Sequence, residues 1–445
     1  MLYWSKYIVK DLIDKVLILW STINSDGIVI TNNYTEVLNS LKSGKNNDEL
    51  SIRLTEKLKS KGFLLTEEQY NLESKLVKGI RNQTVYDEGF MSLTIIPTSI
   101  CNFNCIYCYQ DAPYHFMSRD IASAIIKMIK QKRELVKLHI SWFGGEPLCN
   151  KELVFALMGD INNVCKEKGI TLIGDMTTNG SLLDLVTFNK LYSLKVANYQ
   201  ITIDGCRRTH DIQRPYKDGR GSFDNIMKNL YDIRDNAKGK FFKIGIRTNF
   251  TGLVDAEFNE FYHTLVDEFS GDRRFYFFFQ WVKNWGGNKI TKIQKELLDD
   301  HDSIQKYGNW MDMMSLTNVK TGDISLIRAC SGLCIACRKN SFLIDTDGSI
   351  CKCTTGLYDG LMSKVKIGYI NESGIIIKDK WKEIEWLSCD TDTDKCENCN
   401  IFPICLGMPC PLHKLKHGET LCRQDDTYVK YILRAMARQG YIESI

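Results

Sequence analysis

The chain has 445 residues, of which 44% are hydrophobic and 25% are charged, the proportions of an ordinary globular protein. Its formal net charge of +4 gives no electrostatic reason to expect a nucleic-acid or membrane partner. The apolar runs are too short to span a bilayer, and no signal-like segment opens the chain, so we expect a cytoplasmic protein.

Residues 1–88 predict a small α+β or winged-helix-like module without cysteine. Short apolar runs and amphipathic stretches follow one another in this order: Val16–Trp20, Gly27–Thr31, Asn33–Leu41, Asp48–Lys59 and Gly62–Leu65. A charged helical stretch, Glu67–Arg81, then leads into the next region.

From residue 90 to about 285, extended and helical segments alternate. The expected strands are Phe90–Thr98, Leu135–Phe143, Ile170–Thr177, Ala197–Ile203, Phe241–Thr248 and Arg274–Val282. The expected helices are Ser118–Arg133 with Ser118 as N-cap, Lys151–Lys168, Ser181–Leu194, Ser222–Ala237 and Asp255–Phe269. Six such units predict an α/β fold, a (β/α)6 partial TIM barrel, with its chemistry at the carboxyl ends of the strands.

The C-terminal part is set apart by its cysteines. The chain has 17 cysteines, none before Cys101 and eleven from Cys330 onward, which favours metal clusters over disulfides. A final helix is expected at Tyr428–Gln439. We therefore expect four parts: a module at 1–88, a partial barrel at 89–287, a connection at 288–325 and a cysteine-rich iron–sulfur domain at 326–445.

Cys101, Cys105 and Cys108 follow the first expected strand with the spacing CxxxCxxC. Three thiolates in one short loop can hold three irons of a [4Fe–4S] cluster and leave the fourth iron open to another ligand. A zinc knuckle or buried inert cysteines are the alternatives. Zinc prefers four closed ligands, and this spacing matches no zinc-finger pattern.

Polar residues follow several more of the expected strands. Trp142 and Phe143 lead into Gly144, Gly145, Glu146 and Pro147, where the glycines let the backbone approach a ligand and Glu146 can accept hydrogen bonds from an ammonium group. The alternative is a simple Gly–Gly turn. Further strand ends carry Thr177–Gly180, Thr202–Gly205 and Arg247–Asn249, and between the last two lie His210, Asp211 and Arg214.

In this order, the CxxxCxxC, GGEP, TTNG and TIDG…THD…R segments resemble the core of radical S-adenosylmethionine (SAM) enzymes. The resemblance implies that Cys101, Cys105 and Cys108 hold the SAM-cleaving cluster. It places Tyr107 beside the adenine and Gly144, Gly145, Glu146 and Pro147 at the methionine amino group. It makes Thr178, Asn179, Thr202 and Arg214 candidates for the ribose and the carboxylate.

The C-terminal cysteines resemble the seven-cysteine SPASM domain, which carries two auxiliary [4Fe–4S] clusters. By this resemblance the outer cluster is held by Cys396, Cys399, Cys405 and Cys422. The inner cluster is held by Cys337, Cys353 and Cys410, with Cys330 or Cys334 as fourth ligand and Cys351 as a competitor. Four residues separate Cys405 from Cys410 where the family usually has three, and a zinc ribbon over 396–405 is the alternative.

Enzymes of this kind mostly modify peptides, and the resemblance is strongest to maturases of ribosomally made peptides. It implies thioether crosslinking by a 5′-deoxyadenosyl radical, a precursor peptide whose leader adds a strand to the N-terminal module, and an electron donor such as flavodoxin or ferredoxin. Carbon–carbon crosslinking, formylglycine formation and small-molecule dehydrogenation are the competing reactions. Two competing interpretations are a module that only braces the barrel and a cluster protein that only transfers electrons. No general base can be assigned among His115, Asp111, Asp204 and Asp211.

Overall fold

The structure is a computed structural model in which two compact units are defined by their internal contacts. It describes residues 2–13, 16–31, 49–110, 115–284, 289–297, 300–317, 327–357, 360–388, 393–408, 410–419, 422 and 426–445. The first unit comprises Met1–Tyr86, Ile304–Arg338 and Ser388–Ile445, and the second comprises Asp87–Ser303 and Lys339–Leu387. The expected stretch Asn33–Leu41 and the residue Asp111 lie outside the described residues.

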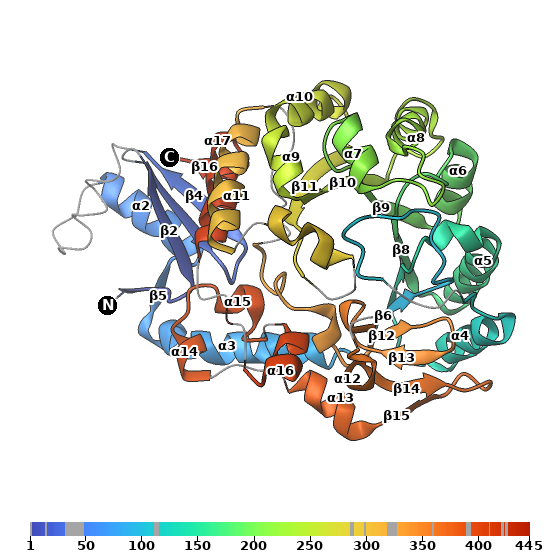
Figure 1. The fold of residues 1–445 in the computed structure, drawn as a ribbon. Coiled ribbons are helices and arrows are strands. Elements are labelled where there is room, and N and C mark those ends of the chain that lie inside the picture. The colour runs from blue at the N-terminus through green and yellow to red at the C-terminus, as the bar shows by residue number, and fades with distance from the viewer. Residues whose placement is uncertain are drawn as a thin grey trace. The chain divides into compact units, whose positions relative to one another are not determined.

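The second unit is built on a sheet whose first six strands run parallel in chain order (Figure 1). These strands are β6 (Phe90–Ile95), β7 (Lys137–Trp142), β8 (Thr171–Thr178), β9 (Val196–Thr202), β10 (Lys243–Phe250) and β11 (Phe275–Trp281). All six expected strands are confirmed. Among the described residues no strand ladder joins β11 to the far edge of the sheet, so the barrel is partial, as predicted.

Helices connect these strands on the outer side of the sheet (Figure 1). They are α4 (Arg119–Gln131), α5 (Lys151–Lys168), α6 (Leu185–Ser193), α7 (Arg207–Gln213), α8 (Phe223–Asn236), α9 (Gly252–Ala256) and α10 (Phe258–Phe269), with a 3-10 turn at Pro147–Asn150. Ser118 caps α4 as predicted, because its hydroxyl accepts from the Ile121 N–H. The helix expected from Ser181 begins only at Leu185, because Asp184 is its N-cap.

The same sheet continues on the other side of β6 with four more strands. β12 (Ser341–Ile344) pairs parallel with β6, and β13 (Ser349–Cys351), β14 (Lys366–Ile370) and β15 (Ile376–Lys378) follow in antiparallel order. Short helical segments complete this unit at Ile290–Glu296, Thr355–Leu357, α12 (Met362–Val365) and α13 (Lys380–Leu387). Part of the cysteine-rich region is therefore hydrogen-bonded directly to the first barrel strand.

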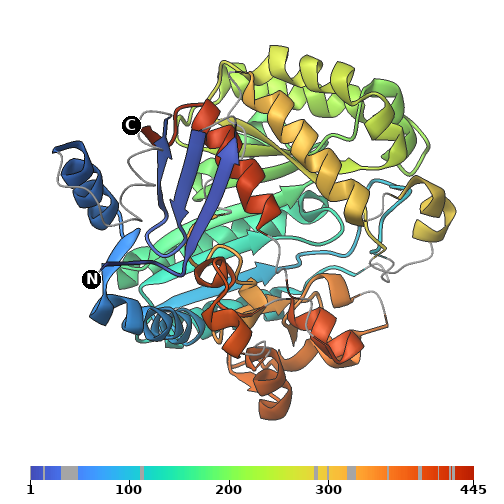
Figure 2. The same ribbon diagram turned by 90° about the vertical axis from the view of Figure 1, so that its left-hand side faces the viewer.

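The first unit contains a small antiparallel sheet formed by β2 (Ile8–Ile13), β3 (Val16–Ser21) and β4 (Asp26–Ile30) (Figure 2). The C-terminal strand β16 (Glu443–Ser444) adds to β4 in parallel. β1 (Leu2–Trp4) pairs with β5 (Leu64–Thr66). The helices are α2 (Glu49–Ser60), α3 (Glu67–Val85), α14 (Thr393–Glu397), α15 (Phe402–Cys405), α16 (Pro411–His417) and α17 (Thr427–Arg438), and a 3-10 turn spans Ile335–Cys337.

The N-terminal sheet and the cysteine-rich segment are joined within this unit by hydrogen bonds. Trp20 Nε1 donates to the Ile327 carbonyl at 3.1 Å, and Thr22 Oγ1 donates to the Asn400 carbonyl at 2.7 Å. α11 (Asp300–Ser315) carries the chain from the second unit into the first. In the described part of the chain, no helix has the length and apolar character needed to cross a membrane.

Candidate active site at the carboxyl edge of the parallel sheet

The loop that follows β6 carries three cysteines close to one another. Burial raises the pKa of Cys101 to about 12 and that of Cys105 to about 11, and the neighbouring Cys108 adds to both shifts. The loop backbone turns tightly here, since the Cys108 N–H donates to the Cys105 carbonyl at 3.3 Å. Thiols in such surroundings become thiolates when a cation such as iron binds them, so the donor set suits a cluster.

The two glycines after β7 allow the start of this loop to pack against them. A Cβ on Gly145 would lie 2.4 Å from the carbonyl oxygens of Ser99 and Ile100, and one on Gly144 would lie 2.5 Å from the Thr98 oxygen. Gly144 also has a φ of +127°, which side-chain-bearing residues rarely adopt. The glycines therefore let the protein's own cysteine loop come close, whereas the sequence predicted that they make room for a ligand.

Glu146 lies fully buried beneath the loop and already has three protein donors. Its carboxylate accepts from the Leu148 N–H at 3.1 Å, the Thr178 hydroxyl at 2.8 Å and the Asn179 N–H at 2.7 Å. Burial raises the pKa of Glu146, and these donors oppose that rise. A carboxylate has about four acceptor positions, so one remains for a further donor.

Asn179 connects the end of β8 to the cysteine loop. Its Nδ2 donates to Asn102 Oδ1 at 2.8 Å and lies 3.9 Å from Cys101 Sγ. Its Oδ1 accepts from the Ser181 N–H and hydroxyl at 2.9 and 2.8 Å. The structure thus brings Thr178, Asn179, Glu146 and Cys101 together, although they come from three separate strand ends.

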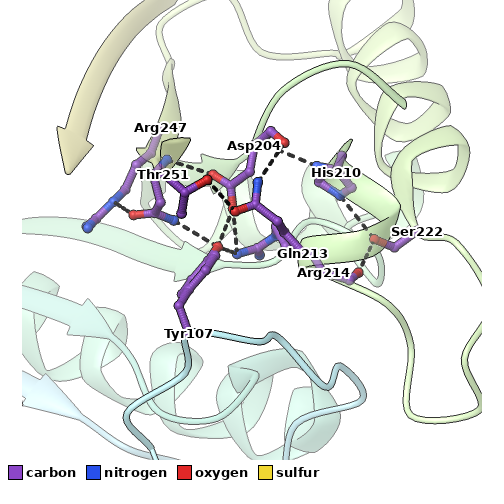
Figure 3. Close-up of polar contacts among 9 residues, drawn as sticks. Tyr107, Asp204, His210, Gln213, Arg214, Ser222, Arg247 and Thr251 are labelled. Carbon is purple, nitrogen blue, oxygen red and sulfur yellow. Dashed lines mark hydrogen bonds and ion pairs between the residues drawn. The ribbon is translucent and has the colours of Figure 1, made fainter. Parts of the chain in front are cut away.

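A second polar group gathers around Tyr107 and Asp204 (Figure 3). The Tyr107 hydroxyl donates to Asp204 Oδ2 and accepts from Arg214 Nη1 at 2.7 Å and Asn249 Nδ2 at 3.0 Å. Burial raises the pKa of Asp204, and the Arg214 guanidinium, 3.7 Å away, opposes the rise. Tyr107 and Arg214 therefore lie in one network with Asp204 at its centre.

His210 is joined to this network through hydrogen bonds to Asp204 and Ser222 (Figure 3). Its Nδ1 accepts from the Asp204 N–H at 3.1 Å, and its Nε2 faces Ser222 Oγ at 3.1 Å. Ser222 Oγ in turn donates to the Arg214 carbonyl at 2.6 Å. Asp211 accepts from the N–H groups of Ser222 and Phe223, so Asp204 and Asp211, both considered as general bases, have structural partners instead.

Three buried polar atoms near this edge have no hydrogen-bond partner among the described residues: Trp142 Nε1, Thr248 Oγ1 and Arg214 Nε. Trp142 and Thr248 share their strand faces with the buried Ile140 and Ile246, whereas Arg214 belongs to the network around Tyr107. Thr202 ends β9 directly opposite Arg247 in the register with β10. A buried donor with no partner is costly, and a ligand carboxylate would satisfy Arg214 Nε, so Arg214 fits the carboxylate of SAM.

A row of polar side chains lower on the sheet was not predicted from the sequence. His139 on β7 lies between Ser92 Oγ, 3.0 Å from its Nδ1, and Asp175 Oδ2, 2.5 Å from its Nε2. The three residues alternate with buried apolar neighbours such as Leu138 and Ile140, which predicts that they face away from the helices. The sequence signal that could have revealed this row is the presence of polar residues in the interior of the predicted strands.

The four cysteines expected for an outer cluster all belong to the first unit. Burial is the main cause that raises the pKa of Cys405 to about 11, and Cys399, Cys396 and Cys422 add to the shift. The Cys399 N–H donates to the Cys396 carbonyl at 3.0 Å, and Gly407 N–H donates to Cys405 Sγ at 3.4 Å. Within the described residues, no three His, Cys, Asp or Glu side chains converge as ligands of one metal ion would. A cluster with four irons differs from such a site, since each thiolate binds its own iron.

The cysteines expected for an inner cluster are divided between the two units. Cys330, Cys334, Cys337 and Cys410 belong to the first unit, and Cys351 and Cys353 belong to the second. Cys330 has a positive φ of 65° and lies 3.7 Å from the Thr84 hydroxyl. Cys337 and Cys351 are buried, and burial raises the pKa of Cys351. The inner ligand set remains a prediction.

Comparisons with known proteins agree with this geometry. The model of the Radical SAM superfamily matches residues 95–265, which include the cysteine loop and the network around Asp204. Over this segment the chain is similar to the Radical SAM superfamily.

Curated relatives match parts of the chain at low identity. The radical SAM cyclopropyl synthase TigE of Paramaledivibacter caminithermalis is 26% identical over 268 residues, 52% of this chain and 54% of its own length. A cysteine-type anaerobic sulfatase-maturating enzyme of Clostridium novyi is 25% identical over 71% of this chain and 86% of its own length. The chain spans about half the length of the first curated relatives that it matches.

Solved structures share the fold. A tagged form of anSMEcpe with bound AdoMet superposes with a TM-score of 0.58 at 17% identity, over 80% of this chain and 100% of its own. SuiB of Streptococcus suis bound to S-adenosylmethionine gives a TM-score of 0.52 at 16% identity, over 93% of this chain and 96% of its own. At these identities the likeness concerns the fold, and it confirms the predicted α/β class.

Proposed function

We propose that this chain is a radical SAM enzyme that modifies a ribosomally made precursor peptide. The observation that carries the proposal is the meeting of the three-cysteine loop with Asn179 and Glu146 at one sheet edge. The partnerless Nε donor of Arg214 supports the same site for SAM.

Different residues of this chain would bind the cluster and the separate parts of SAM. Cys101, Cys105 and Cys108 would hold the cluster, which when bound supplies the electron that converts SAM to methionine and a 5′-deoxyadenosyl radical. Arg214 Nε has capacity for the carboxylate, and Thr178, Asn179 and Thr202 are the further candidates for the ribose and the carboxylate. Glu146 retains one acceptor position for the methionine amino group, and Gly144, Gly145 and Pro147 fix the backbone around it. Tyr107, held by Asp204, would present its ring to the adenine.

Two auxiliary [4Fe–4S] clusters complete the proposal and bring the total to three. Cys396, Cys399, Cys405 and Cys422 would hold the outer one, and their place in one unit, with the Cys399 N–H donating to the Cys396 carbonyl, supports it. Cys337, Cys353 and Cys410, with Cys330 or Cys334, would hold the inner one. Flavodoxin or ferredoxin would supply electrons, and thiolate clusters suit the reducing cytoplasm.

A peptide substrate is supported by the small sheet of the first unit, where an added strand can bind an extended leader. SuiB has been solved with its precursor peptide SuiA, and anSMEcpe with a Cys-containing peptide named Kp18Cys. Cysteine thioether formation is the reaction that we rank first. It would remove two hydrogens from the peptide: one as an atom to the 5′-deoxyadenosyl radical and the other as a proton. An auxiliary cluster, if held by the C-terminal cysteines, would supply the acceptor for the remaining electron.

A carbon–carbon bond is the second candidate, and the relative TigE, a cyclopropyl synthase, favours it. Formylglycine formation follows, on the likeness to sulfatase-maturating enzymes, and small-molecule dehydrogenation comes last.

The test is anaerobic reconstitution with iron, sulfide, dithionite and SAM, with and without the small peptide encoded beside the gene, followed by mass spectrometry. The proposal predicts that the peptide loses about two hydrogens, and tandem spectra then separate a sulfur–carbon from a carbon–carbon crosslink. An unchanged peptide mass, together with formation of 5′-deoxyadenosine, would contradict crosslinking and leave SAM cleavage intact.

A further inference from the structure

The outer edge of β4 is occupied by a segment from the far end of the sequence. β16 runs parallel to β4, with Glu443 opposite Ile28 and Ser444 opposite Val29 (Figure 1). The Ile445 N–H donates to the Val29 carbonyl at 2.9 Å, and the Ile445 carbonyl accepts from the Thr31 N–H at 3.0 Å. Residues 443–445 therefore pair with the sheet as an added peptide strand would.

Two side chains of this segment have specific partners in the first unit. Glu443 lies 2.6 Å from Lys57 Nζ and 3.3 Å from Lys61 Nζ, at the end of α2. Ile445, two positions later on the same side of the strand, packs against the buried cluster that includes Ile28, Ile30 and Leu58. We call the β4 edge with these two lysines and this cluster the β4 edge site.

The segment that pairs with β4 is short, and its contacts differ from those of the helix before it. β16 has two residues, and Tyr441, Glu443 and Ser444 are exposed. The preceding helix α17 is held by different contacts, since Arg434 pairs with Asp11 at 2.7 Å and Arg438 pairs with Asp312 at 2.6 Å. Gly440, with a φ of +70°, forms the turn between the two. Ile442 is the one buried side chain of the segment, so leaving the edge would expose Ile442 while the ion pairs of α17 stay in place.

We propose that the β4 edge site binds an extended peptide with an acidic residue followed two positions later by an aliphatic residue. Residues 441–445 are its internal occupant and compete with that peptide. The identity of the peptide as the leader of a precursor rests on the proposed function, whereas the binding site itself does not depend on SAM chemistry.

The test uses a fluorescein-labelled synthetic peptide with the sequence of residues 440–445 and a reconstituted chain that ends at Gly440. Fluorescence polarisation should show saturable binding to the shortened chain and at least about tenfold weaker binding to the full chain. Lys57→Glu in the shortened chain should weaken binding about tenfold, and a peptide with lysine in place of the glutamate should recover part of it. Lys59→Glu, on an exposed position of the same helix, is the matched control and should change little.

If the shortened chain proves unfolded by circular dichroism, the full chain with Glu443→Lys and Ile445→Asp replaces it, because these changes weaken only the occupant. A folded variant that fails to bind the peptide, or that binds it equally well with Lys57→Glu, would overturn the inference. The same samples are assayed for 5′-deoxyadenosine. If SAM is cleaved but the peptide does not bind, only this inference is refuted. If the peptide binds but SAM is not cleaved, only the proposed function is refuted.

Discussion

Arg214 is 7% exposed and belongs to a network in which almost every polar atom has a partner. One guanidinium nitrogen donates to Tyr107, and its charge balances Asp204, but Nε has no partner among the described residues. The planar fork of arginine can contact Tyr107 and a carboxylate at once, which a lysine ammonium cannot do. Arg214 therefore has one donor left for a ligand carboxylate, as the proposed SAM site requires.

We expect Arg214→Lys to raise the dissociation constant for SAM about tenfold or more, because the charge stays but the second donor is lost. Equilibrium dialysis of the reconstituted protein measures this, with iron content as a check on the cluster. Arg207→Lys is the control, since Arg207 is exposed on α7 and pairs with Asp224. Equal SAM affinity in both variants would refute the assignment.

His210 gives a pH prediction at the same scale. Burial lowers the pKa of His210 well below its ordinary 6.5, so the folded protein holds it neutral while the unfolded chain takes up a proton. The contribution of neutral His210 to the free energy of unfolding is complete above about pH 6.5 and is lost as the pH falls. We expect the stability advantage of wild type over His210→Gln to shrink between pH 7 and 5.5, by at most about 1.4 kcal/mol per pH unit. Urea unfolding at several pH values measures it, and a pH-independent difference would count against a neutral His210.

At the scale of elements, the loop after β6 depends on the turn after β7. The Gly145 N–H donates to the Thr98 carbonyl at 3.2 Å, and the Glu146 N–H donates to the Ile100 carbonyl at 2.8 Å. The two strand ends thus hold each other where the cysteines begin, and there is no room for a side chain between them.

Gly145→Ala should displace the cysteine loop and reduce the iron bound to it, because the new Cβ meets two carbonyl oxygens at 2.4 Å. Iron analysis and the rate of 5′-deoxyadenosine formation are the measurements. Gly159→Ala in α5 is the matched change, since its Cβ would meet only Leu194 at 3.9 Å, and it should stabilise the helix by about 0.5–1 kcal/mol. Full iron loading and activity in Gly145→Ala would contradict the role given to the turn.

The alternating strands and helices of the barrel could be predicted because their periodicity is local. α5 has the predicted bounds, and Ser118 caps α4 as expected. The pairing of β16 with β4 could not be predicted, because two exposed residues carry no pattern and the contact joins positions far apart in sequence. The spacing of Cys101, Cys105 and Cys108 marks their loop in the sequence, whereas the partners of Asp204 depend on the register of three strand ends.

At the scale of the whole molecule, the chain crosses between its two units more than once. The N-terminal sheet shares a unit with Cys396, Cys399 and Cys405, and Tyr7 donates to the Glu397 carbonyl at 3.0 Å. The proposed leader-binding sheet and the outer cluster segment are thus parts of one folded body, and the proposed SAM site belongs to the second unit.

From this separation we expect Cys399→Ala to remove the outer cluster and leave SAM binding unchanged. Iron content should fall from about twelve to about eight atoms per chain, since each of three clusters holds four irons. Cys206→Ala, outside every proposed ligand set, should keep the full complement. A variant that loses all of its iron would show instead that the clusters assemble together.

The most direct measurement of the central claim is 5′-deoxyadenosine formed from SAM and dithionite by the reconstituted wild type, Cys105→Ala and Cys165→Ala. Cys165 is buried in α5 and belongs to no proposed ligand set, so it controls for loss of a buried thiol. The account predicts 5′-deoxyadenosine from wild type and Cys165→Ala and none from Cys105→Ala. Equal product from Cys105→Ala, or none from a fully iron-loaded wild type, would contradict it.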